Sequence, residues 1–246
     1  EKILEFSEKK ISNYFLIVSL FYFILKFTRL SEYGNDLPSN LFSILSIFYF
    51  LKFSETTNLE NKKSFFFLNF TYATMSILIK FSSIPLLFLT IILFIRNYKN
   101  LFREVFRIEF IIIYILCIFF FIQQFIYTGC LIFPSEFSCF NVSWYNNEFL
   151  LLRENLELTN KSYHLASDIF SKEEYLKNFN WISFWLQRNY IEILEHIVTM
   201  LIPVSLFFLF SKKYNKKNIL IFKDKKLFFL FIIISFSFWL KFSPVY

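Results

Sequence analysis

Residues 108 to 128 (IEFIIIYILCIFFFIQQFIYT) form an apolar run whose only charged side chain is Glu109. A helix needs about 20 mostly apolar residues to cross the hydrocarbon core of a bilayer, and this run has that length. Further runs follow the same pattern at 11–27, 65–95, 191–210 and 227–241. A soluble domain would have to bury all of these runs in one core, whereas lipid accommodates them directly. The runs therefore predict an all-α, polytopic integral membrane protein.

Composition and charge agree with this class. Of the 246 residues 56% are hydrophobic, above the roughly 45–50% that is usual for soluble domains. The formal charge of +7 would suit a nucleic-acid partner, but the basic residues cluster in two short segments between apolar runs. That distribution is typical of cytoplasmic loops. The lipid bilayer, and no nucleic acid, is therefore the predicted partner.

The runs predict a bundle of about seven spans. The stretch 65–95 is too long for one span and carries Lys80 followed by Pro85, so two helices that turn near Lys80 are expected. The short segment 40–53 is counted as a tilted span, with a re-entrant piece as the alternative. A membrane bundle is thus predicted over 1–128, a loop over 129–190 and two further spans in 191–246. The predicted spans lie near 11–27, 40–53, 65–79, 81–95, 108–128, 191–210 and 227–241.

Short basic loops predict the orientation of these spans. Residues 211–226 hold seven Lys and one Asp, so 7 − 1 = +6, and residues 96–107 hold four bases and one acid, so 4 − 1 = +3. Both segments are expected in the cytoplasm, which places 129–190 outside. Because each span takes the chain to the other side of the membrane, counting the spans backwards from 96–107 places Lys80 and the 28–39 loop outside as well. The long loop is therefore expected to be extracytoplasmic.

The long loop contains two amphipathic stretches, at 147–160 and 171–189, with apolar residues at three- and four-residue spacing. The second carries Trp181 and Trp185, four positions apart, and is expected to lie at the membrane surface before the chain re-enters. A helix that caps the bundle is an equal alternative.

Cys130 and Cys139 lie in the string TGCLIFPSEFSCF at 128–140, on the side where thiols tend to pair. A structural disulfide is expected, and two free thiols are the alternative. Cys117 lies within an apolar run and is interpreted as a small buried hydrophobe.

Charged residues in the 28–39 loop, TRLSEYGNDLPS, are the first candidates for chemistry. Arg29, Glu32 and Asp36 follow a helix end, and the loop's Gly and Pro are expected to shape a turn. Such groups at the mouth of a bundle can bind a metal, a phosphate or a sugar, and Glu32 or Asp36 could act as a general base. A solvated turn is the alternative for each of them.

Lys80 is the second candidate, because a charge between two apolar helices is costly unless it reaches water or a partner. Binding of a phosphate is one interpretation, and a side chain that reaches to the interface is the other. We expect Arg29, Glu32, Asp36 and Lys80 to meet at one outward cavity covered by the long loop.

Motifs for cofactors and metals are not found in the sequence. There is no glycine-rich phosphate loop, nucleophile elbow or CxxC pair, and the two histidines are not spaced as ligands. No cofactor is therefore predicted, and a divalent metal stays an open alternative.

Four strings carry a resemblance to a known family: RLSEYGNDLP at 29–38, IKFSSIP at 79–85, TGCLIFPSEFSCF at 128–140 and KFSPVY at 241–246. In this order they resemble a family of uncharacterised bacterial polytopic membrane proteins, similar in layout to multi-spanning cell-envelope glycosyltransferases. Members of that family are longer at both ends, and their first outer loop holds an Asp similar to a catalytic one. The resemblance implies that this sequence is a fragment without the principal catalytic loop.

The resemblance also implies a location, the bacterial inner membrane, and a reaction. A sugar would pass from a polyprenyl-phosphate donor to an acceptor at the outer face, with Glu32 or Asp36 as candidate base and with Arg29 and Lys80 holding the phosphate. The alternative is a structural or transport subunit of a membrane complex, which would perform no chemistry of its own.

Overall fold

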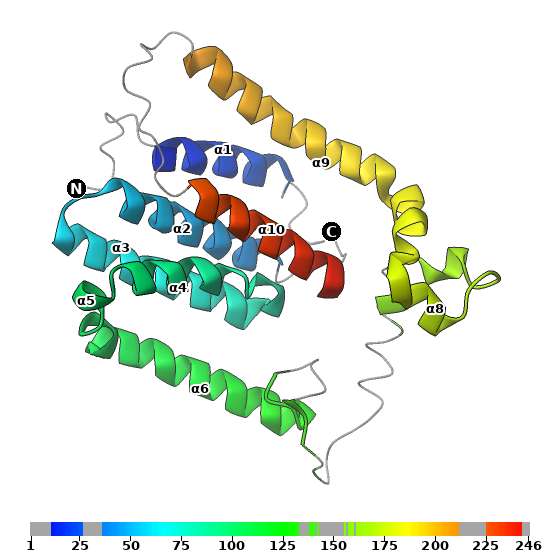
Figure 1. Ribbon diagram of the computed structural model, residues 1–246, viewed down its shortest axis with the longest axis horizontal. Coiled ribbons are helices and arrows are strands. Elements are labelled where there is room, and N and C mark those ends of the chain that lie inside the picture. Colours follow the sequence, from blue (N-terminus) through cyan, green and yellow to red (C-terminus); the bar gives the residue numbers. More distant parts are fainter. Residues whose placement is uncertain are drawn as a thin grey trace. The chain divides into compact units, whose positions relative to one another are not determined.

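The computed structural model describes residues 11–26, 36–132, 138–140, 142, 155, 157–159, 161–211 and 225–242. Within these residues the chain is helical apart from turns and one antiparallel bridge between Cys130 and Cys139. The predicted all-α class is confirmed (Figure 1). The α-helices are α1 (Ile11–Lys26), α2 (Asp36–Glu55), α3 (Leu59–Ile79), α4 (Leu86–Arg96), α5 (Tyr98–Leu101), α6 (Ile108–Thr128), α8 (Lys172–Leu176), α9 (Trp181–Ser211) and α10 (Lys225–Phe242). The 3₁₀ helices are η2 (Phe81–Ser83), η3 (Glu104–Phe106), η5 (Tyr163–Leu165) and η6 (Lys177–Phe179).

Two helices in the described part of the chain are long and apolar enough to cross a membrane: Leu37–Glu55 in α2 and Ile108–Thr128 in α6. A third candidate is the pair Phe81–Arg96 and Tyr98–Phe106, which bends by 96°. A shorter apolar helix covers Ser12–Ile24. Two or three helices able to span a bilayer therefore indicate a membrane protein.

The second helix is longer than the sequence suggested. The predicted span of 40–53 becomes a helix of 20 residues, because the segment around Pro38 is its first turn rather than part of the preceding loop. Proline is tolerated there, since the N–H groups of a first turn have no partner within the helix. The expectation that this proline shapes a turn outside the helix is wrong.

The long apolar stretch is divided near Lys80, as the sequence predicts. Helix α3 starts behind Asn58, whose side chain accepts hydrogen bonds from the N–H groups of Glu60 at 2.9 Å and Asn61 at 3.4 Å. It ends at Ile79, and Lys80 has an extended backbone with φ −143° and ψ 109°. The short helix η2 and Pro85 then lead into α4.

The chain divides into two compact units, Glu1–Ile113 with His196–Phe238, and Tyr114–Glu195 with Trp239–Tyr246. In the first unit α1, α2 and α3 pack in chain order, and α4 packs against both α2 and α3 (Figure 1). Its core is largely aliphatic and aromatic. The buried hydrophobic residues are Phe50, Leu51, Phe53, Phe66, Ala73, Leu86, Leu89, Leu93, Leu101, Phe110 and Phe231.

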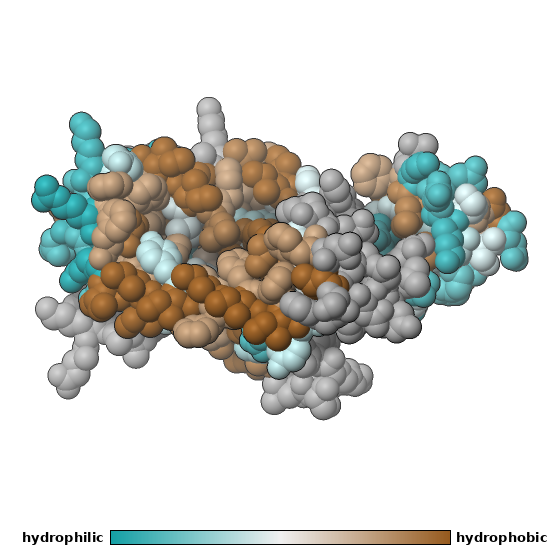
Figure 2. Space-filling model, turned by 90° about the horizontal axis from the view of Figure 1, so that it is seen from below, coloured by the Kyte–Doolittle hydropathy of each residue, from teal (hydrophilic) through white to brown (hydrophobic). Residues whose placement is uncertain are grey.

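Aromatic ring contacts hold the start of α6 to this core. Phe110 is 2% exposed, and its ring centre lies 5.0 Å from that of Phe67 and 5.9 Å from that of Phe66. Other side chains of α6 are exposed, among them Ile112 at 55% and Phe119 at 64%. Figure 2 shows apolar residues over much of the visible face. Apolar surface of this extent requires lipid or another apolar partner.

Helix α9 differs from the prediction. The sequence suggested a surface helix up to residue 189 and a separate span from 191, but one helix runs from Trp181 to Ser211. The reason is local: no Gly or Pro lies between Trp181 and Ile202, so nothing in the sequence ends the helix at the predicted boundary. The amphipathic pattern and the apolar pattern belong to the same element.

Candidate functional site

Four serine side chains form a hydrogen-bonded group at one end of the α2–α3 pair. This hydroxyl cluster consists of Ser39 and Ser43 of α2, Ser76 of α3, and Ser83 of η2. The Oγ of Ser39 lies 3.1 Å from the Oγ of Ser76 and 3.1 Å from the Oγ of Ser83. The Oγ of Ser43 lies 2.8 Å from that of Ser76. Ser39 is 1% exposed and Ser76 is fully buried, and direct hydrogen bonds among the hydroxyls join the three elements.

The spacing of these serines explains why they meet. Ser39 and Ser43 are one helical turn apart and therefore share a face of α2. Ser76 lies in the last turn of α3, where its Oγ also donates to the carbonyl of Ser39 at 2.9 Å. Because α2 and α3 run in opposite directions, the start of one helix faces the end of the other. The turn after α3 then brings Ser83 back to Ser39.

Lys80 is attached to the hydroxyl cluster through its backbone. Its N–H donates to the carbonyl of Ser76 at 2.9 Å, and its carbonyl accepts from the N–H of Ser83 at 3.0 Å. The side chain is half-buried. The backbone of Lys80 is thus fixed next to two members of the hydroxyl cluster.

The structure places only some of the predicted site residues. Asp36 is the first residue of α2, so its backbone lies at the same end of the α2–α3 pair as Lys80. Arg29 and Glu32 lie outside the described residues. The expected meeting of all four charged groups therefore stays a prediction.

A second polar group, which sequence reasoning missed, lies deeper between α2, α3 and α4. Nδ2 of Asn69 donates to the carbonyl of Ser46 at 2.8 Å, and its Oδ1 accepts from the hydroxyl of Thr90 at 2.9 Å. Asn69 and Ser46 are fully buried, and Thr90 is 4% exposed. The signal was present in the sequence as an amide in the middle of an apolar helix. We call this group the Asn69 bridge.

The start of α1 is fixed by a carboxylate from the end of α2. Glu55 accepts from the N–H of Ser12 at 2.9 Å and from its Oγ at 2.6 Å. A negative charge at the N-terminus of a helix is favourable, because the first N–H groups have no partner within the helix. Nearby, Nζ of Lys52 donates to Oδ1 of Asn13 at 2.8 Å. These contacts fasten α1 to α2 at the end remote from Lys80.

Metal ligands do not gather in the described part of the chain. Among those residues no group of three His, Cys, Asp or Glu side chains is arranged to hold an ion.

Cys130 and Cys139 of the second unit are joined. The sulfur atoms of Cys130 and Cys139 are 2.05 Å apart, as in a disulfide. The backbone pairs around them, since the N–H of Phe140 donates to the carbonyl of Gly129 at 2.9 Å. Gly129 follows α6 with φ 73°, a left-handed conformation that glycine adopts without steric cost. Cys117 carries a free, half-buried thiol.

A small core in the second unit surrounds Trp181, which is 2% exposed. Lys161 is also buried, at 4% exposure, and its ammonium group lies 5.2 Å from the ring centre of Trp181 and pairs with Glu157. The hydroxyl of Tyr175 donates to the carbonyl of Lys161. A buried charge is tolerated here because it has both a carboxylate and an aromatic face as partners.

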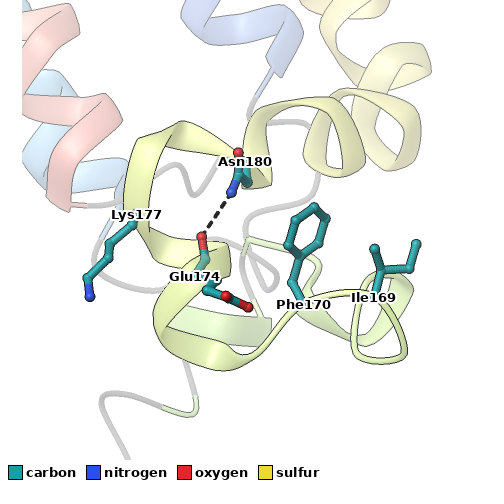
Figure 3. A pocket seen from close by; sticks show the side chains of 5 residues that line it. All are labelled: Ile169, Phe170, Glu174, Lys177 and Asn180. Atoms are coloured by element: carbon teal, nitrogen blue, oxygen red, sulfur yellow. Dashed lines mark hydrogen bonds between the residues drawn. The ribbon is translucent and has the colours of Figure 1, made fainter.

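A cavity of about 400 Å³ lies beside this core (Figure 3). Polar groups that line the cavity already form hydrogen bonds within the local fold. The carboxylate of Glu174 accepts from the N–H and hydroxyl of Ser171, and Nδ2 of Asn180 donates to the carbonyl of Glu174 at 3.0 Å. We therefore interpret it as part of the α8 turn. The cavity is lined by Ile169, Phe170, Glu174, Lys177 and Asn180.

Burial raises the pKa of Tyr175 to about 12, from an ordinary value of 10.0. A neutral phenol is thus favoured in the folded state, so its contribution is complete below pH 10 and is lost as the pH rises to about 12. We expect the second unit to lose on the order of 2 kcal/mol over this window. Tyr175→Phe should remove the pH dependence, whereas Tyr190→Phe, at an exposed position, should keep it. Hydrogen exchange of the full chain, corrected for the intrinsic rate, measures this; an unchanged dependence in Tyr175→Phe would contradict it.

The similarity to known proteins concerns the whole chain rather than one site. No curated protein and no solved structure matches it. A family match covers all of residues 1–246, including the α2–α3 pair, the hydroxyl cluster and the cysteine-linked turn. The chain therefore belongs to the family described as a domain of unknown function, DUF8201.

Proposed function

We propose that this membrane protein takes part in cell-envelope glycan assembly, and that Lys80 with the hydroxyl cluster holds the phosphate of a polyprenyl-phosphate-linked sugar. The observation that supports the proposal is the attachment of Lys80 to the cluster through both of its backbone groups. In the proposal, the Lys80 side chain brings positive charge to the end of the α2–α3 pair where the hydroxyl cluster lies. Phosphate oxygens accept from such donors.

The proposed reaction transfers the sugar to an acceptor at the outer face. Lys80 would stabilise the negative charge that develops on the departing phosphate. This speeds the reaction only if Lys80 binds the phosphate more tightly in the transition state than in the intact donor. Glu32 and Asp36 remain the candidate bases, and Arg29 is the candidate second phosphate ligand.

The proposal includes a topology of about seven spans. Residues 96–107 would face the cytoplasm and 129–190 the outside. In a Cys117→Ser background, we expect Ser167→Cys to react with an impermeant thiol reagent in intact cells and Asn100→Cys to react only after lysis. Both positions are exposed in the structure, so access to the reagent depends on the side of the membrane. The reverse pattern would contradict the outer-face site.

Binding of the donor phosphate can be tested without knowing the acceptor. Lys80→Ala should weaken binding of polyprenyl phosphate to the full chain in lipid nanodiscs by about tenfold to a hundredfold, the usual loss for a hydrogen bond to a charged group. Lys62→Ala is the matched control, because Lys62 lies near the start of α3, at the opposite end of the helix. Polyprenol without phosphate should bind equally to all three proteins. Equal binding of the phosphate to Lys80→Ala and the unchanged chain would contradict the proposal.

A structural subunit is the second candidate, and one observation favours it. The members of the hydroxyl cluster hydrogen-bond to one another and so already join α2, α3 and η2. Hydrogen bonds between helices stabilise membrane bundles without any ligand. If Lys80→Ala binds polyprenyl phosphate normally but Ser76→Val lowers the melting temperature, the cluster has this structural role.

A further inference from the structure

A row of aromatic rings runs along the segment after α4. Phe94, Tyr98, Phe102 and Phe106 are spaced four residues apart, and we call them the aromatic row. Successive ring centres lie 5.4, 5.0 and 5.4 Å apart. Tyr98, Phe102 and Phe106 are 49%, 43% and 66% exposed. The row is therefore continuous: Phe94 packs against the core of the first unit, and the other three rings are left exposed by the described part of the chain.

Basic residues accompany the aromatic row. Lys99 and Arg103 are exposed and lie between the rings in the sequence. The acid of this segment, Glu104, forms salt bridges with Arg107 and Lys63, with N–O distances of 3.0 and 3.2 Å. The segment thus presents positive charge together with aromatic surface.

The orientation of the segment relative to α4 is the third observation. The helical stretch Tyr98–Phe106 is bent by 96° from Phe81–Arg96. Leu101, at 1% exposure, fixes the segment to the core of the first unit. If α4 lies along the membrane normal, a segment at a right angle to it lies in the membrane plane. The candidate span α6 then begins directly at Ile108.

We propose that residues 98–106 lie in the headgroup layer of an anionic leaflet, with the aromatic row at the boundary of the acyl chains and Lys99 and Arg103 at lipid phosphates. Aromatic side chains favour this depth because their rings are apolar while the surrounding groups remain hydrated. Charge complementarity favours anionic lipid over a neutral surface. This inference does not depend on the proposed glycan function.

Spin labels on the full chain test the depth of the segment. The label would be attached to Phe102→Cys, Phe106→Cys or Lys99→Cys in a Cys117→Ser background without reductant, with the background protein as the labelling blank. In nanodiscs of phosphatidylcholine and phosphatidylglycerol, positions 102 and 106 should be more accessible to oxygen than to a water-soluble nickel complex. Position 99 and the control Ser167→Cys should show the opposite preference.

The basic residues are tested by exchanging the lipid. The chain should retain phosphatidylglycerol over phosphatidylcholine, and Lys99→Gln with Arg103→Gln should reduce that preference by up to about thirtyfold, at about fivefold for each base. The control pair Lys172→Gln with Lys177→Gln removes two exposed bases from another segment and should leave the preference unchanged.

Each outcome decides the proposal. Oxygen preference at 102 and 106 together with a charge-dependent lipid preference supports it. Labels at 102 and 106 that the nickel complex reaches freely, or dipolar broadening that places them against a second copy of the chain, would overturn it. If the Lys99→Gln, Arg103→Gln variant fails to fold, the spin labels at positions 102 and 106, which leave both bases in place, still show whether the segment lies in the headgroup layer.

Discussion

Trp181→Ala should lower the opening free energy of the second unit by about 3–5 kcal/mol, the usual cost of removing a large buried aromatic side chain. Trp181 is 2% exposed and packs edge-on against Trp185, with ring centres 6.3 Å apart. It also covers the ammonium group of the buried Lys161 at 5.2 Å. The substitution therefore leaves a cavity and removes the aromatic partner of a buried charge.

Hydrogen exchange of the full chain measures this effect locally. Amides of η5, α8 and the first turns of α9 should exchange about a hundredfold to several thousandfold faster in Trp181→Ala, since each 1.4 kcal/mol corresponds to about tenfold. Leu186→Ala is the control on the same helix, because Leu186 is 45% exposed. If the two variants exchanged alike, Trp181 would not be the centre of this core.

The second large effect is expected from Asn69→Asp. This substitution keeps the shape of the side chain but places a carboxyl group in a fully buried position between α2, α3 and α4. The cost should be about 2.5–3.5 kcal/mol, similar to that of an acidic residue at the centre of a membrane helix. Protonation removes the charge and supplies one O–H donor, but the amide makes two donor contacts to Ser46, so one of them is still lost.

A matched substitution on the same helix isolates the effect of burial. Asn61→Asp makes the same chemical change at an exposed position in the first turn of α3, where a negative charge is favourable. In lipid nanodiscs, Asn69→Asp should unfold at a clearly lower temperature than the unchanged chain. For Asn61→Asp the free energy of unfolding should stay within about 0.5 kcal/mol of that of the unchanged chain. Equal behaviour would show that the Asn69 bridge contributes little.

Much of the helical class follows from apolar runs, and the positions where prediction fails have physical causes. The run at 108–128 became α6 with the same bounds, and the charge of Lys80 marked a true break between helices. Helix α2 was underestimated because a proline near its start was interpreted as a turn. Helix α9 was divided at residue 190 because polar and apolar stretches were assigned to different environments, although the backbone has no reason to end there.

The candidate site was less predictable than the helices. Lys80 stood out as a charge in an apolar stretch, and two cysteines in one short string indicated a pair. The serines of the hydroxyl cluster carry no motif, because each is an ordinary residue until α2 and α3 are placed antiparallel. The role of Asn69 likewise becomes visible only when the helices are placed together, because its side chain hydrogen-bonds to two neighbouring helices at once.

The short connection between α2 and α3 has a consequence for biogenesis. Only Thr56, Thr57 and Asn58 separate the two helices. The polar side chains of one helix find their acceptors on the other, so either helix entering acyl chains alone would carry unpaired amide and hydroxyl groups. We expect the translocon to release the two as a preformed helical hairpin, with insertion and pairing as one event. A glycosylation-mapping reporter fused after α2 alone should then show poor insertion that α3 restores.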